Sequence, residues 1–525
     1  MSGRIILLTI TAYFGLLLFI SWLTGRKDAD NAAFFLANRK SPWYIVAIGM
    51  IGSSLSGVTF VSVPGLVRQI DMTYMQMVFG FFFGYIVIAN ILLPLYYRLN
   101  VVSIYSFLEQ RIGRYGYKTG ASFFLLSKLI GAASRLYLVV WILQTYVFDQ
   151  WRIPFALTVI ISVLLVWLYT YRSGIRTILW TDVLQTFCLI GMLLVILWQV
   201  KTKIGLEMAE MIQTVSQSPH FRLFEFTDWH NTQHFVKQFF SGMFITIVMT
   251  GLDQDMMQKN LSCRNLRDAQ KNMYWYGLAF TPVNFLFLCL GILLVVAASQ
   301  MHIELPTAGD DILPMFCTSG LLGPFIVVCF TIGIIAAAFS SADSALTALT
   351  TSFCVDILGV QGSRFEVQGS GFGVQGSKIG VQGSGFGVQG SEVEVQGGKS
   401  ELQGRIIRMK VHAGMAVLFA LTILIFKALN SRSLIDAIYT IASYTYGPLL
   451  GLFAFGLFTK RQTKDKFVPL ICIASPVICF LLNHFVYLHT GYKFGYELLI
   501  VNGLITFAGL WMMSMFKVQC SKFNV

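Results

Sequence analysis

The chain has 525 residues, of which 56% are hydrophobic and 12% charged, with a formal net charge of +13. A soluble domain carries about a quarter charged residues, so this composition excludes an ordinary soluble protein. The basic residues are scattered through loops and form no patch with aromatic residues, which argues against a nucleic-acid partner.

Apolar stretches of roughly 20 residues, the length that a helix needs to cross the hydrocarbon core, recur along the chain. We predict an all-α integral membrane protein with about 13 transmembrane helices. Only Arg4 precedes the first stretch, and no small-residue cleavage site follows it, so we expect residues 1–24 to remain as an extra N-terminal transmembrane helix. The predicted helices centre near residues 14, 54, 86, 134, 163, 190, 246, 286, 338, 420, 446, 478 and 506.

The loops between these stretches alternate in their content of Lys and Arg. One set of loops carries 26 of the 38 basic residues, against 10 in the other set and two inside helices. By the positive-inside rule the richer side is cytoplasmic. We therefore expect a multi-pass protein of the plasma (inner) membrane with its N-terminus outside and its C-terminus in the cytoplasm.

The second apolar stretch, residues 43–66, is a poor continuous helix because it is rich in Gly and Ser and contains Pro64. In a bilayer, unwound backbone survives only where it is buried or lines a cavity, and there its free carbonyls can bind cations. The alternative is a close-packed glycine helix.

Three charged positions lie within or beside apolar stretches. Lys128 lies near the inner end of its stretch and can reach the membrane surface, whereas Arg135 lies about two turns deeper. Arg135 either forms a structural ion pair or binds a substrate carboxylate through two hydrogen bonds from its planar guanidinium. Asp182, just inside another stretch, either caps a helix N-terminus or takes part in cation binding.

Further along, residues 251–272 bring several charges to the inner side, among them Asp253, Asp255 and Lys259. A solvated loop is the simple interpretation, and a gate of salt bridges is the alternative. Within residues 360–404 the triplet V-Q-G recurs every seven residues. Gly in each repeat and few apolar positions forbid a coiled coil, so we expect a disordered cytoplasmic insert that transport does not need.

Residues 332–356 are apolar enough to span a membrane, yet they carry a stripe of hydroxyl groups and one carboxylate, Asp343. Positions three and four residues apart share a helical face, and no Lys, Arg or His within the stretch can pair with this acid. Such a stripe of oxygen ligands suits an alkali cation. The alternative is that the hydroxyls bond to their own helix and Asp343 faces water. Acids inside a membrane are costly and usually functional, which favours the cation.

Four motifs in this order resemble the sodium/solute symporter family, and the S-x-x-T-F run at 56–60 with the deep Arg135 resembles its sialic acid and organic anion transporters. The resemblance covers most of residues 5–515, apart from the repeat insert and the C-terminal helices. The motifs are G-S-S-L-S-G-V-T-F-x-S-x-P-G at 52–65, R-x-G-I-R-T-x-x-W-T-D-x-x-Q at 172–185, G-x-D-Q-x-x-x-Q at 251–258 and A-x-x-S-S-A-D-S-A at 337–345.

The resemblance implies a LeuT-like core of two inverted five-helix repeats, each beginning with a broken helix. The first repeat would occupy residues 42–200 as helices 2–6. The second would occupy 236–458 as helices 7–11, with the insert in one of its cytoplasmic loops. Residues 467–516 would form the C-terminal transmembrane helices.

The resemblance also implies three sites. The sodium site would use the carbonyls of Gly52, Leu55 and Ala337 and the hydroxyls of Ser340 and Ser341. A second site, for a cation or a proton, would use Asp182, Asp343 and Ser344. Family members with two sodium ions carry Ser at the position of Asp343, so the identity of the ion at the second site stays open. The substrate pocket would use Ser56, Thr59, Gln76, Arg135 and Phe244.

We therefore predict a sodium-coupled symporter, not an enzyme, which imports a small organic solute by alternating access. A carboxylate or acidic sugar is favoured, because the acid and amide of the family's galactose and glucose carriers are absent at Val58 and Thr59. The alternatives are a sodium/neutral sugar symporter and a proton-coupled transporter using Asp343 or Asp182. A hydrolase is disfavoured because no G-x-S-x-G surrounds the serines at 340–341. Na⁺, the solute and the lipid bilayer are the expected partners; the oligomeric state stays open, and a monomer is compatible with the sequence.

Overall fold

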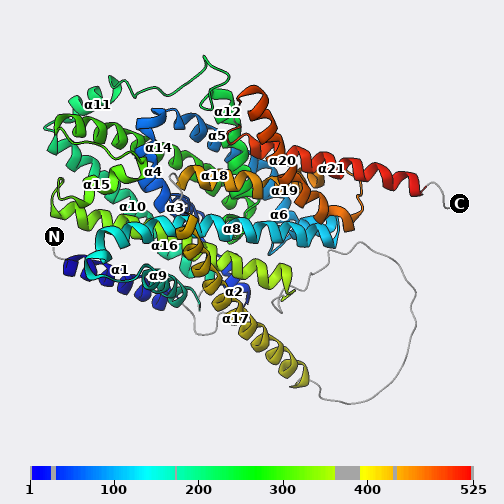
Figure 1. The fold of residues 1–525 in the computed structure, drawn as a ribbon. Helices are drawn as coiled ribbons and strands as arrows, with labels where there is room; N and C mark the ends of the chain where they lie inside the picture. Colours follow the sequence, from blue (N-terminus) through cyan, green and yellow to red (C-terminus); the bar gives the residue numbers. More distant parts are fainter. Residues whose placement is uncertain are drawn as a thin grey trace, which may run out of the picture.

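The computed structural model describes residues 3–24, 31–171, 174–360, 391–429, 434–492 and 494–521. Within these ranges the chain is built from helices, and the only extended pairing is a single bridge between Ser41 and Cys263. The helices pack side by side into one bundle, with α8 and α16 passing through its middle (Figure 1). The prediction of an all-α protein is confirmed.

Nine of the described helices are long and apolar enough to cross a membrane, and three bent helix pairs raise this number to 12. A shorter apolar helix, α9 (Phe155–Thr170), lies where the remaining predicted span, centred near residue 163, was expected. Each predicted span therefore coincides with an apolar helix or a bent pair of helices.

The first half of the bundle begins with a break in its second span. Helix α3 (Trp43–Ser54) ends where α4 (Gly57–Ile70) begins, and the two axes differ by 59°. Leu55, with φ −77° and ψ 76°, and Ser56, with φ −73° and ψ 169°, leave the helical region. The other helices of this half are α5 (Tyr74–Val87), α6 (Leu93–Leu99), α7 (Ser106–Arg111), α8 (Arg114–Leu143), α9 and α10 (Gly174–Lys203).

The second half begins with a second break. Helix α12 (Phe235–Thr246) continues as a π-helical turn to Gly251, and α13 (Gln254–Leu261) then leaves it at 64°. The Asp253 side chain caps α13 by accepting a hydrogen bond from the amide of Asp255 at 2.9 Å. The later helices are α14 (Leu266–Gln300), α15 (Ile312–Thr318), α16 (Pro324–Ser352), α17 (Ser391–Leu429), α18 (Leu434–Thr445) and α19 (Gly447–Phe458).

Five further helices lie outside these two halves or connect their parts. They are α1 (Gly3–Thr24), α2 (Asn31–Leu36), α11 (Met208–Ser216), α20 (Val468–Thr490) and α21 (Leu498–Ser521). Helix α1 packs beside α9, and α20 and α21 pack on each other next to α19 (Figure 1). The broken helix at the start of each half, which the sequence analysis predicted, is confirmed.

Most of the V-Q-G repeat, residues 361–390, lies outside the described residues. Helix α17 begins at Ser391, so residues 391–404, which we expected to be disordered, belong to a helix. For the remainder the disordered insert stays a prediction, as do the boundaries of the two repeats.

Candidate functional site: an internal cavity between the two helix breaks

A cavity lies where the two broken spans meet. Ser53 and Ser54, at the end of α3, line it from the first break, and Thr250, Asp253 and Asp255 line it from the second. Helices α5, α8, α14, α16 and α18 supply the rest of its wall. Unwound backbone in a bilayer survives where it borders such a cavity, so the position of the cavity accounts for both breaks.

Arg135 lines this cavity from the middle of α8. Its guanidinium forms no hydrogen bond or ion pair with any residue in the described ranges, although five N–H donors are available. Gly131 and Ala132, one turn earlier, are small and leave room beside it. Because an unpaired charge inside a membrane is costly, this guanidinium is the clearest candidate for binding a ligand in the cavity.

The other four predicted substrate residues lie outside the lining of the cavity. Ser56 is buried at the start of α4, and Thr59 is partly buried one turn later. The Gln76 amide is held by an outer loop, since it donates to the Gln233 carbonyl at 2.8 Å and accepts from the Glu225 amide at 3.0 Å. Phe244 is partly buried on α12. Their contact with substrate stays a prediction.

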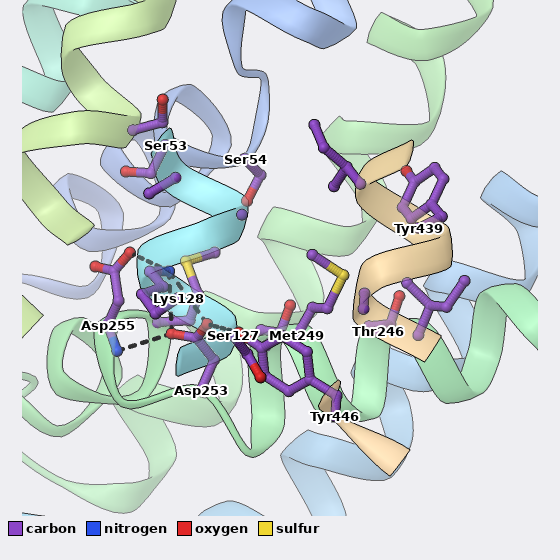
Figure 2. A pocket seen from close by; sticks show the side chains of 18 of the residues that line it. Ser53, Ser54, Ser127, Lys128, Thr246, Met249, Asp253, Asp255, Tyr439 and Tyr446 are labelled. Carbon is purple, nitrogen blue, oxygen red and sulfur yellow. Dashed lines mark hydrogen bonds and ion pairs between the residues drawn. The ribbon is translucent and has the colours of Figure 1, made fainter. Parts of the chain in front are cut away.

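A cluster of charges closes one end of the cavity (Figure 2). The Lys128 ammonium lies 2.7 Å from Asp255 Oδ2 and 3.1 Å from Asp253 Oδ2. The hydroxyl of Tyr446, between α18 and α19, donates to the same Asp253 oxygen at 2.8 Å, which joins α8, the second break and the start of α19. Lys128 is buried and paired, so its side chain does not extend to the membrane surface as the sequence analysis allowed.

A second ion pair lies deeper, between α10, α13 and α16. Lys259 Nζ is 2.7 Å from Asp182 Oδ2 and donates to Ser344 Oγ at 2.7 Å and to Ser53 Oγ. Ser340 Oγ donates to the other carboxylate oxygen of Asp182 at 2.6 Å. Both charged side chains are fully buried. The interpretation of residues 253–259 as a solvated loop is therefore wrong, because all eight residues of α13 are buried against neighbouring helices.

Asp343 is joined to this ion pair through Ser344. Its Oδ1 accepts hydrogen bonds from the amide of Ser344 at 2.5 Å and from the Ser344 hydroxyl at 3.2 Å, and its Oδ2 accepts one from the hydroxyl of Tyr169, on α9, at 3.0 Å. Of the three residues predicted for a second cation or proton, Asp182 and Ser344 thus bind Lys259 directly, and Asp343 is held beside them by Ser344 and Tyr169.

The five residues predicted to bind sodium lie on two helices that pack together, α3 with its break and α16. In a continuous helix the Ser56 amide would bond the carbonyl of Gly52, but it bonds Ser54 O at 2.9 Å. A Cβ on Gly57 would lie 3.9 Å from Ala338 N, so the break directly faces this part of α16. Freed carbonyls beside serine hydroxyls are oxygen ligands of the kind that sodium requires, and the residues fit a sodium site. Here Ser341 Oγ donates to Ala338 O at 2.9 Å.

The sequence analysis assigned no site role to Lys128 or Lys259. The available signal for Lys259 was its position directly after the G-x-D-Q-x-x-x-Q motif at 251–258. For Lys128 there was none beyond its place in an apolar stretch, because its partners, Asp253 and Asp255, lie more than 100 residues away.

A family model described as the sodium:solute symporter family matches residues 34–360, more than half of the chain. The chain belongs to this family. The family that the four motifs indicated is thus confirmed, and with it the use of Na⁺ as the coupling ion. The family and the relatives described below are transporters.

Two relatives are both named as symporters of sodium and sialic acid. The chain is 25% identical to the sodium/sialic acid symporter SiaT of Proteus mirabilis over 344 residues, which are 63% of this chain and 66% of that protein. It is 22% identical to the sodium/sialic acid symporter NanT of Aliivibrio fischeri over 478 residues, which are 88% of this chain and 85% of that protein.

A solved structure gives the same fold. A Na⁺-coupled sialic acid symporter in a substrate-bound outward-open state superposes with a TM-score of 0.76, covering 98% of both chains at 19% identity. At this identity the likeness concerns the fold alone, and it confirms the LeuT-like architecture.

Proposed function

We propose that this protein is a sodium-coupled symporter that imports a small solute bearing a carboxylate, such as an acidic sugar, by alternating access. The observation that carries the proposal is Arg135, a guanidinium that borders the internal cavity without a partner in the described part of the chain. Two relatives that carry sialic acid, an acidic sugar, support this class of substrate.

The chemistry of the cavity suits such a solute. A guanidinium binds a carboxylate through two parallel hydrogen bonds, and these bonds are stronger than those between neutral groups. Hydroxyl groups of Ser54, Tyr276 and Tyr439 border the same cavity and can exchange hydrogen bonds with a sugar. Lys128, the other basic residue of the lining, is already paired with two carboxylates. Arg135 therefore remains to recognise the anion.

Coupling would arise at the first break. When bound, Na⁺ would supply one positive charge shared by the oxygens of Gly52, Leu55, Ala337, Ser340 and Ser341. Because these oxygens come from two helices, the state in which α3 and α16 lie together would be stabilised. Only such a difference in affinity between states can shift the conformational equilibrium.

The direction of transport follows from orientation. With the Lys- and Arg-rich loops in the cytoplasm, the N-terminus lies outside and the C-terminus inside the plasma (inner) membrane. An inward sodium gradient and the membrane potential would then both favour uptake, the potential by about 2.3 kcal/mol per charge per 100 mV.

The test is uptake of radiolabelled N-acetylneuraminate, a sialic acid, into proteoliposomes that contain the purified protein. We expect uptake with an inward Na⁺ gradient and none with K⁺. Arg135→Gln should raise the KM about 10- to 100-fold, because a hydrogen bond to a charged group contributes about 1.5–3 kcal/mol. Arg264→Gln, at an exposed arginine, is the matched control and should behave as wild type.

Competition and gradients distinguish the alternatives. Excess of other carboxylates should compete with the labelled solute, and excess glucose or galactose should not. Competition by neutral hexoses alone would favour a sodium/neutral sugar symporter. Uptake driven by a proton gradient without Na⁺ would contradict sodium coupling and direct attention to Asp343.

A further inference from the structure

The second cation position implied by the family is the part of the site that does not fit a metal ion. One of its two carboxylates, Asp182, and its hydroxyl, Ser344, both accept hydrogen bonds from the ammonium of Lys259. We propose that Lys259 is a built-in cation that replaces a second sodium ion, so that the protein binds a single Na⁺, at the first break. This inference rests on the proposed function, since it presumes a sodium-coupled carrier.

The geometry of the ammonium supports the replacement. An ammonium group has three N–H donors, and Lys259 directs them to Asp182, Ser344 and Ser53. These three oxygens come from α10, α16 and α3. A sodium ion at the same place would need the lone pairs that these hydrogen bonds already use, so the ammonium and the ion exclude each other.

Charge balance also supports the replacement of a second sodium ion by Lys259. The carboxylate of Asp182 also accepts hydrogen bonds from Ser340 at 2.6 Å and from Ser53 at 3.0 Å, and it is fully buried. Lys259 compensates its negative charge within the protein, and the other buried carboxylate of the site, Asp343, accepts hydrogen bonds from Tyr169 and Ser344. A monovalent cation bound to Asp182 beside the ammonium would meet a like charge in a buried site, where repulsion between charges is strong.

The position of Lys259 in the fold makes retreat of its side chain costly. Helix α13 is buried throughout, and Asp255, one turn before Lys259, is bound by Lys128. A Lys259 side chain drawn away from Asp182 would break the buried ion pair, and breaking a buried pair is strongly destabilising. The ammonium is therefore a fixed part of the site.

The experiment counts bound ions. Purified full-length protein is saturated with radiolabelled Na⁺, and the number of ions per chain is compared between wild type, Lys259→Met and the exposed control Lys271→Met. Methionine keeps the length of the side chain and removes its charge. We expect one Na⁺ for wild type and for the control, and two for Lys259→Met. The double variant Lys259→Met/Asp182→Asn should return to one, because it removes the carboxylate that would hold the second ion.

Each possible number of bound Na⁺ ions either supports or overturns the inference. Two ions bound by wild type would overturn the inference, as would an unchanged number in a folded Lys259→Met protein. Should Lys259→Met fail to fold, the wild-type number alone still decides between one ion and two. Absence of any Na⁺ binding by wild type would contradict the proposed function, whereas the gain of one ion in Lys259→Met would still identify the lysine as the group that excludes it.

Discussion

The two helix breaks of this protein have similar geometry and different chemistry. Both interrupt a membrane span near the internal cavity, with bends of 59° and 64°. The first break is built from Gly and Ser and brings no charge of its own. The second is followed within a few residues by Asp253, Asp255 and Lys259, all of them buried.

The difference shows two ways to keep unwound backbone inside a membrane protein. At the first break, a freed carbonyl lies on a helix that packs on α16, which carries serine hydroxyls, and such oxygens suit an ion from solution. At the second, the Asp253 side chain caps the new helix, and Lys128 compensates the local negative charge. The first break thus carries no charge of its own, and the second is held by charges of the chain. The predictions below test this contrast.

The largest effect is expected at the second break. Lys128→Met would leave Asp253 and Asp255 buried without their shared cation, and removal of one partner from a buried pair costs about 3–5 kcal/mol. We expect a marked fall in the thermal unfolding temperature of the purified protein. Lys128→Arg should retain most of the stability. An unfolding temperature of Lys128→Met equal to that of Lys271→Met, at an exposed lysine, would show that the cluster does not hold the break.

A smaller effect is expected where the first broken span packs on α10. A Cβ on Gly52 would lie 2.1 Å from Thr186 Oγ1, which is fixed by hydrogen bonds to Ile48 O and Asp182 O. Gly52→Ala should therefore cost about 1–3 kcal/mol of stability through overpacking. The matched variant is Gly131→Ala, where no atom lies within 4 Å, and there the better helix propensity of Ala should preserve or raise stability. Equal unfolding temperatures for both variants would contradict close packing at Gly52.

The smallest effect on stability is expected from Ser341→Ala, which should act on ion binding. The hydroxyl bonds only a carbonyl of its own helix, so its loss should change the unfolding temperature little. Loss of one of the proposed oxygen ligands should weaken Na⁺ binding roughly tenfold, or about 1.4 kcal/mol. Tryptophan fluorescence during a Na⁺ titration, with K⁺ as the ionic control and Ser216→Ala on exposed α11 as the control variant, measures the change. Unaltered Na⁺ affinity would remove Ser341 from the site.

Much of the fold could be predicted because its signals are local. Apolar stretches of membrane-spanning length indicate the spans. Gly and Ser around residues 52–57 and Pro64 weaken the helix at the very stretch where the structure bends. Arg135 could likewise be singled out, since a charge deep in an apolar stretch stands out from its neighbours.

The charge pairing could not be predicted, because it depends on distant segments. The sequence analysis found no basic partner near the acid in residues 332–356, and for Lys259 it left a solvated loop and a gate of salt bridges open without naming a partner. The structure turns α13 inward against α10 and α16, which brings Lys259 to Asp182 across 77 residues of sequence. Gln76, expected in the substrate pocket, is bound by an outer loop instead.

The sequence by itself thus determined the number and place of the spans, the first break and the family, since each depends on hydropathy or on short motifs. Only the tertiary structure decided which charges face one another, which oxygens remain available for an ion, and that Arg135 has no partner in the described ranges. The physical reason is that burial in a membrane protein makes each charge depend on a partner. Helix packing, rather than local sequence, supplies that partner.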